Sequence, residues 1–99
     1  YISDNNLGGG DSVTICTVNL VTGKLSACTD SGVGPIFSAP VSVNLNAANT
    51  LLYVSNNGTV NPTVTSCVIN STTGTLSNCV NADGDGSAVF TAPAGVTLR

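Results

Sequence analysis

Charged side chains are scarce in this chain of 99 residues, and several residue types are missing altogether. It holds two basic residues and five acidic ones, all aspartate, with no Glu, His, Met or Trp. Two basic residues cannot neutralise a run of phosphates, so nucleic-acid binding is excluded. Without His and Glu the chain lacks the usual general bases and most metal ligands. The sequence therefore predicts no catalytic residue and no cofactor.

Long apolar runs are missing as well. The longest, residues 51–54, is far too short for a membrane-spanning helix. Apolar residues still make up 41% of the chain, which is enough to bury a core and argues against disorder. Ser, Thr, Asn and Gly fill 47 positions. This composition favours an uncharged polar surface with many turns.

Two copies of one unit account for nearly the whole chain. Three stretches recur, at offsets of 51, 53 and 52: residues 13–28 as 64–79, residues 36–45 as 89–98, and residues 1–5 as 53–57. The first of these is identical at nine of sixteen positions. The changes of offset fall in Gly- and Asn-rich loops, where a change of length costs little. We divide the chain into a first repeat, residues 1–51, and a second repeat, residues 52–99.

Each repeat is expected to form four short strands, because β-branched and polar residues alternate between turn residues. Named A to D, they are expected at 40–45 and 93–98 (A), 51–55 and 1–3 (B), 12–19 and 63–70 (C), and 24–29 and 75–80 (D). The segments 30–39 and 81–92 are expected to be loops. Four strands in about fifty residues, in tandem, are typical of β-propeller blades. A small immunoglobulin-like β-sandwich is the alternative.

The motifs within each repeat resemble those of a known family. Leu-Tyr-Val-Ser-Asn at residues 52–56 is followed by a Val-Thr strand and by Asn-x-x-Thr-Gly-x-Leu at residues 70–76. This pattern resembles the repeat of the bacterial YVTN and lactonase-like β-propellers, and it implies their all-β blade fold. The chain differs from the family in its cysteine pairs and in having two blades only. Family members that are enzymes are expected to use His, Glu or Arg in loops that lack them here, so a lactonase fragment is a minor alternative.

The four cysteines predict two disulfides, Cys16–Cys28 and Cys67–Cys79. Each pair is twelve residues apart with a Thr-Gly turn midway, so a hairpin about residue 22 or 73 sets its two cysteines opposite each other. Opposed residues have Cβ atoms about 4.5–5.5 Å apart, and a local twist must bring them to the roughly 3.5–4.5 Å of a disulfide. A zinc site, with its tighter cysteine spacing, and free buried cysteines are the alternatives.

Disulfides form in oxidising compartments, so we expect a secreted, extracellular or cell-surface protein. The chain begins at Tyr1 and has no methionine, which indicates a segment trimmed after secretion or a part of a longer chain. Asn57 and Asn70 each open an Asn-x-Thr sequence and are candidate glycosylation sites.

Few residues of the sequence indicate a ligand site. Asp83 and Asp85 alternate with glycine and are calcium candidates, although an ordinary Asp-Gly turn explains them as well. The four aromatic residues occupy repeat-equivalent positions, which favours packing between blades over a platform for sugars. They are Tyr1, Phe37, Tyr53 and Phe90. A lectin-like module that binds carbohydrate or calcium is the alternative function.

The strand order B-C-D-A-B-C-D-A predicts assembly. The B strand at residues 1–3 lacks an A strand before it, and the A strand at residues 93–98 lacks a B strand after it. We expect these two segments to pair between chains, through Tyr1, Ile2 and Ser3 of one and Val96, Thr97 and Leu98 of another. Closure gives a ring of two, three or four copies, with three the first expectation, and an open contact gives a filament. The sequence thus favours a non-enzymatic, extracellular structural module.

Overall fold

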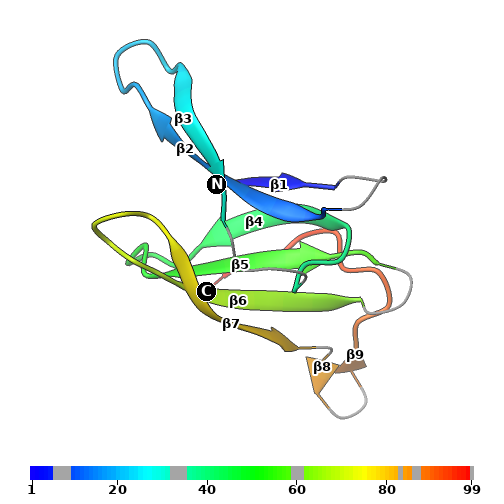
Figure 1. Ribbon diagram of the computed structural model, residues 1–99. Helices are drawn as coiled ribbons and strands as arrows, with labels where there is room; N and C mark the ends of the chain where they lie inside the picture. Colours follow the sequence, from blue (N-terminus) through cyan, green and yellow to red (C-terminus); the bar gives the residue numbers. More distant parts are fainter. Residues whose placement is uncertain (6–9, 32–35, 59–61, 83, 86–87, 99) are drawn as a thin grey trace.

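The chain folds into two antiparallel sheets that lie face to face (Figure 1). The computed structural model describes residues 1–5, 10–31, 36–58, 62–82, 84–85 and 88–98. Every regular element among these residues is a strand, which confirms the predicted all-β class. Within the same ranges there is no helix of the length and apolarity that a membrane crossing requires.

Both sheets follow the order of the sequence. The first sheet consists of β1 (Ile2–Asp4), β2 (Ser12–Val18) and β3 (Leu25–Asp30), in the order β1-β2-β3. The second consists of β4 (Pro40–Leu45), β5 (Leu51–Asn56), β6 (Thr63–Ile69) and β7 (Leu76–Ala82), in the order β4-β5-β6-β7. A two-stranded sheet of β8 (Gly84–Asp85) and β9 (Ala88–Val89) follows. The expected A strand at residues 40–45 thus belongs to the sheet of the repeat that follows it.

The expectation of a loop throughout residues 81–92 is wrong. Asn81 and Ala82 extend β7 because they pair with Thr65 and Val64 of β6, and the β8–β9 hairpin lies beyond them. The length of β7 is therefore set by its partner strand, although Asn and Ala have low strand propensity themselves. Residues 93–98 belong to no sheet within the described part of the chain.

The two long hairpins close in the same way. Asn19 accepts hydrogen bonds through Oδ1 from the backbone N–H groups two and three residues further on, and Asn70 does the same. The glycine four residues after each asparagine adopts a positive φ, +72° at Gly23 and +76° at Gly74. Because an asparagine side chain can replace a backbone acceptor and glycine tolerates positive φ, the motif Asn-x-x-Thr-Gly specifies this turn.

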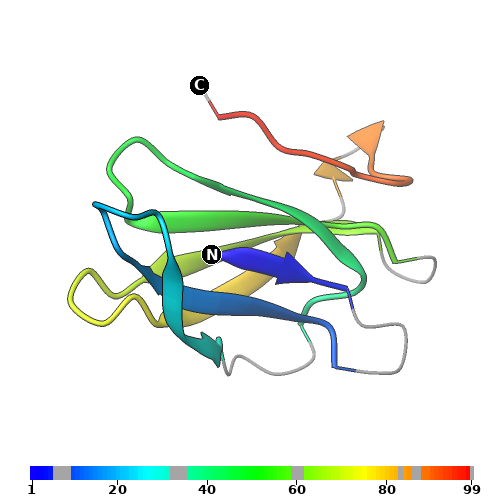
Figure 2. The same ribbon diagram turned by 90° about the horizontal axis from the view of Figure 1, so that it is seen from above.

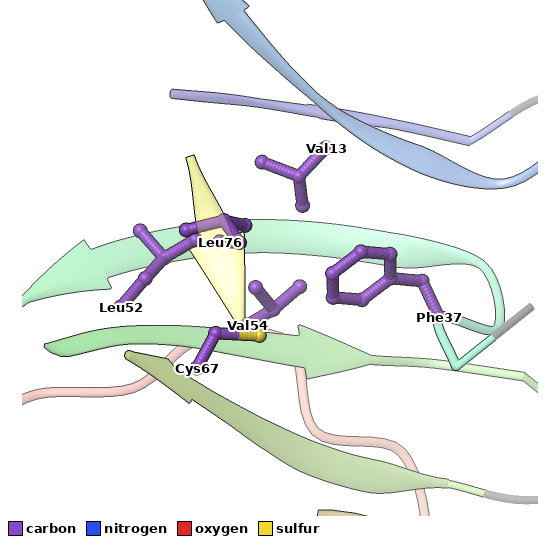
Figure 3. Close-up of a cluster of buried hydrophobic side chains, with 6 residues drawn as sticks. All are labelled: Val13, Phe37, Leu52, Val54, Cys67 and Leu76. Atoms are coloured by element: carbon purple, nitrogen blue, oxygen red, sulfur yellow. The ribbon is translucent and has the colours of Figure 1, made fainter. Parts of the chain in front are cut away.

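The core lies between the two sheets (Figure 3). Val13 of β2 points toward the second sheet, where its side chain is fully buried. The second sheet contributes most of the remaining core side chains, and Phe37 closes the cluster from the segment before β4. The buried apolar residues are Val13, Phe37, Leu52, Val54, Cys67 and Leu76.

Uncharged polar side chains extend this interior and form hydrogen bonds with one another. Nδ2 of Asn56 donates to Oγ1 of Thr63 at 3.0 Å and to Oγ1 of Thr65 at 2.7 Å. Thr65 in turn donates to Oδ1 of Asn81, and the Ser38 N–H donates to Oδ1 of Asn56. Buried polar groups are tolerated when they are hydrogen-bonded in this way. A chain rich in Asn and Thr can therefore use both residue types inside.

The segment that follows β9 runs along the other side of the second sheet. Figure 2 shows it on the side opposite to β1 and β2. Asn44 of β4 anchors it there, because its Nδ2 donates to the backbone oxygen of Val96 at 2.8 Å. The neighbouring β4 side chain Val43 packs instead against the core, on the first-sheet side. The second sheet thus lies between the first sheet and residues 93–98.

Truncation of Leu76 and of its repeat equivalent Leu25 provides a matched test of this core. Leu76 is 6% exposed and Leu25 is 52% exposed. In dilute protein, Leu76→Ala is expected to lower the free energy of unfolding by about 2–4 kcal/mol, and Leu25→Ala by less than about 1 kcal/mol. Urea unfolding followed by circular dichroism measures both. Equal losses would contradict the described packing.

Candidate functional site

Titratable side chains do not gather at one place in the described residues. Asp11 has a structural contact, since its carboxylate accepts the Ala39 N–H at 2.7 Å. No group of three or more potential metal ligands occurs within the ranges that the structure covers. Of the calcium candidates, Asp83 lies outside the described residues and Asp85 belongs to the short strand β8. A calcium site there remains a prediction.

Both predicted disulfides are present. Cys16 is bonded to Cys28 and Cys67 to Cys79, with Cα atoms 4.0 Å and 4.1 Å apart. The zinc site and the free cysteines considered as alternatives are therefore ruled out, because all four thiols are used.

A β-bulge, which the sequence reasoning missed, accompanies each disulfide. The register of the first hairpin shifts between Ile15 and Thr17, opposite Ala27, which adopts φ +48°. The second hairpin shifts between Ser66 and Val68, opposite Asn78, also at φ +48°. A bulge places two residues of one strand against one of its partner and bends the strand locally. Only Asn78 carried a sequence signal for positive φ, since alanine rarely adopts it.

The two disulfides have different surroundings. Cys67 is 1% exposed and Cys79 packs against the core cluster. Their repeat equivalents lie on the projecting first hairpin, where Cys16 is partly exposed and Cys28 is exposed (Figure 1). The loop that each bond closes has the same length, so the loss of chain entropy in the unfolded state is the same for both.

Removing each disulfide as a pair of alanines separates these two contributions. Both double variants lose up to about 3 kcal/mol from chain entropy. Cys67→Ala with Cys79→Ala is expected to lose about 1–2 kcal/mol more than Cys16→Ala with Cys28→Ala, because it also empties volume in the core. Urea unfolding of the two variants checks the difference. Equal destabilisation of the two double variants would contradict the deeper burial of the Cys67–Cys79 disulfide.

Tyr1 links the first sheet to the turn of the second hairpin. Its ring packs against the core, and its hydroxyl donates to the backbone oxygen of Gly74 at 2.6 Å. Partial burial raises the pKa of the Tyr1 hydroxyl above its usual value. The positions of Tyr1 and Phe37 in and against the core confirm for these two residues the predicted role of the aromatics in packing.

The pKa of Tyr1 can be measured in isolation, because the chain has two tyrosines only. In a Tyr53→Phe variant, absorbance near 295 nm is expected to rise at a higher pH in the folded protein than after unfolding in urea. Since the folded state favours the protonated hydroxyl, its contribution to stability is present below the unfolded pKa and is lost as pH rises through the folded pKa. Coincident titration curves would contradict the buried hydrogen bond.

The two candidate glycosylation sites lie where an acceptor asparagine is accessible. Asn57 and Asn70 are both exposed, after β5 and in the turn between β6 and β7. Thr59, the third residue of the first site, lies outside the described residues. Glycosylation of either asparagine remains a prediction.

The outer faces of the two sheets expose large apolar side chains to solvent. We call the side of each sheet that carries β5 residue Val54, or its repeat equivalent Ile2, the front face, and the opposite side the back face. Within the chain, the back face of the first sheet packs on the front face of the second. The front face of the first sheet, by contrast, is exposed to solvent. Part of it lies on the β2–β3 hairpin, which projects from the rest of the chain in Figure 1.

Repeat-equivalent residues on the two front faces differ sharply in exposure. Val54 is fully buried, and its equivalent Ile2 is 42% exposed. The same contrast separates Leu76, which is buried, from Leu25, which is half exposed. Val18 is also exposed, whereas its equivalent Ile69 packs against the core. The first sheet thus presents to solvent the apolar face that the second sheet buries.

The residues expected to pair between chains belong to an edge strand and to a segment outside every described sheet. Ile2 and Ser3 belong to β1, which pairs with β2 on one side and with no other described strand on the other; Tyr1 directly precedes it. Val96, Thr97 and Leu98 belong to the unpaired terminal segment. The second sheet separates β1 from this segment, so the two do not pair within one chain (Figure 2).

Comparisons with protein-family models, with curated proteins and with solved structures returned no match to this chain.

Proposed function

We propose that this protein is a non-enzymatic, extracellular structural module whose sheets are β-propeller blades and which assembles with further copies of itself. The uncovered apolar front face of the first sheet carries the proposal, because Val54 and Leu76 on the equivalent face of the second sheet are buried. Apolar surface of this kind on a small protein marks an interaction site.

The order of the strands supports blades over a sandwich. Consecutive strands stay in one sheet, β1 to β3 and then β4 to β7. Immunoglobulin-like sandwiches instead distribute successive strands between two sheets through Greek-key connections. A four-stranded sheet in sequence order is the unit that propellers repeat around an axis.

Strand exchange between copies follows from the repeat. Residues 93–98 match β4 in sequence, and β4 pairs with β5. The repeat equivalent of β5 is β1, whose outer edge is free of other described strands. Residues 93–98 of one copy therefore complete the first sheet of the next copy as its fourth strand. This pairing would also protect an edge strand that otherwise exposes backbone donors and acceptors.

The chemistry of the surface suits a structural role outside the cell. Two disulfides indicate an oxidising environment. Seven per cent of the residues are charged, so few groups change state with pH. A heterologous contact of this kind gives a closed ring of two, three or four copies, with three the first expectation, or a filament.

The mass of the native protein in solution tests this function. Light scattering coupled to size-exclusion chromatography is expected to give a multiple of the 9.8 kDa chain, and negative-stain images are expected to show rings or filaments. Val96→Pro and Thr97→Pro each remove one backbone donor, and successive donors point to opposite edges, so at least one variant is expected to dissociate. A folded, monodisperse monomer of the unaltered chain would overturn the proposal.

A further inference from the structure

We propose that the joint between copies repeats the packing found inside one chain. The back face of the second sheet of one copy covers the front face of the first sheet of the next, and the Tyr53 hydroxyl of the first copy donates to the Gly23 carbonyl of the second. This inference rests on the self-assembly proposed above and identifies the surfaces that make it.

The contact inside the chain provides the template. From the back face of the first sheet, Tyr1 and Val13 pack toward the second sheet, and Phe37 closes the cluster beside them. On the opposing front face they meet Val54 and Leu76. Each of these five positions has an equivalent in the other repeat.

The equivalent positions on the outer faces have the same chemistry. Tyr53, Val64 and Phe90 correspond to Tyr1, Val13 and Phe37, and all three are partly exposed. Ile2 and Leu25 correspond to Val54 and Leu76. The back face of the second sheet adds Val68 and Val80, which are 39% and 62% exposed. At these positions both outer faces thus carry apolar or aromatic residues, as their counterparts in the core do.

The glycines of the two hairpin turns also differ in how closely other atoms approach them. A Cβ added to Gly74 would lie 3.5 Å from the Tyr1 hydroxyl oxygen and 3.7 Å from Cγ2 of Ile15. A Cβ added to Gly23 would have no atom within 4 Å, although its φ is nearly the same. One hairpin turn is therefore covered by the preceding sheet, and the other is open.

Tyr53 can supply to the turn at Gly23 the hydrogen-bond donor that Tyr1 supplies to the turn at Gly74. It is the repeat equivalent of Tyr1, and its hydroxyl has no hydrogen bond among the residues that the structure describes. In the assembly it takes the position over Gly23 that Tyr1 takes over Gly74. The hydrogen bond closes the same turn motif, Asn-x-x-Thr-Gly, in both repeats.

A second copy of the chain is the occupant that fits both faces together. The same chain carries apolar side chains exposed on both outer faces, the open edge of β1, and residues 93–98, which belong to no described sheet and already lie on the back-face side of the second sheet. A contact between two different faces is heterologous, so each copy can bind one neighbour through its front face and another through its back face.

Two variants that each disable one face test this pairing directly. Leu25→Lys places a charge on the front face of the first sheet. Ser66→Lys places one on the back face of the second, at the equivalent of Ile15, which packs against the core. Ala48→Lys, at an exposed position in the turn between β4 and β5, is the matched control outside both faces. Circular dichroism and urea unfolding establish that all three fold.

Each face variant alone is expected to weaken assembly at least tenfold, and the control less than twofold. Mixed in equal amounts, Leu25→Lys and Ser66→Lys are expected to form a complex of two chains, because one intact front face meets one intact back face. The proposed pairing is wrong if Leu25→Lys and Ser66→Lys each assemble as tightly as the unaltered chain. It is also wrong if their mixture keeps the mass of single chains. In both cases the self-assembly of the unaltered chain still stands. A monomeric unaltered chain would overturn both.

The tyrosines provide a second measurement that keeps both faces intact. Tyr53→Phe removes the hydroxyl only and is expected to weaken assembly about 3–10-fold without changing the urea midpoint of the dissociated chain. Tyr1→Phe, the matched control, is expected to lower that midpoint and to change the assembly constant less than twofold. An unchanged assembly constant for Tyr53→Phe would overturn the predicted hydrogen bond to Gly23.

Discussion

The packing of the first sheet on the front face of the second is the contact on which the rest of the structure depends. It buries Val13, Val54 and Leu76 together, and it holds Tyr1 over the turn at Gly74. No other cluster of buried apolar side chains is found in the described part of the chain. Because a small domain buries a smaller fraction of its surface than a large one, this one contact has to organise both sheets.

Covalent and hydrogen-bonded links supplement this small core in place of charges. The disulfides tie the strands of both long hairpins, and the Asn56–Thr65–Asn81 network satisfies polar groups inside the second sheet. Small extracellular domains use disulfides to offset the limited burial that their size allows. Asparagine and threonine suit such an interior because they hydrogen-bond without bringing a charge out of water.

The tandem repeat also explains why apolar side chains remain exposed on the outer faces of the two sheets. Two repeats placed in tandem make one contact between sheets, and within the described residues they leave the front face of the first sheet and the back face of the second without a partner sheet. Residues 93–98, which belong to no sheet, lie along that back face. Ile2 and Leu25 on one side and Val68 and Val80 on the other remain exposed for this reason. A unit that packs on its own copy can accept a further copy in the same way, which is the basis of the proposed assembly.

The sequence by itself determined what depends on neighbours along the chain: the repeat, most strand ranges, the Thr-Gly turns and the pairing of Cys16 with Cys28 and Cys67 with Cys79. These follow from alternation and from hairpin geometry over a dozen residues. The bulges at Ala27 and Asn78 and the full length of β7 needed the register of the partner strand. Only the tertiary structure decided that Leu76 is buried and Leu25 exposed, since the two occupy identical motifs and burial depends on which sheet lies above them.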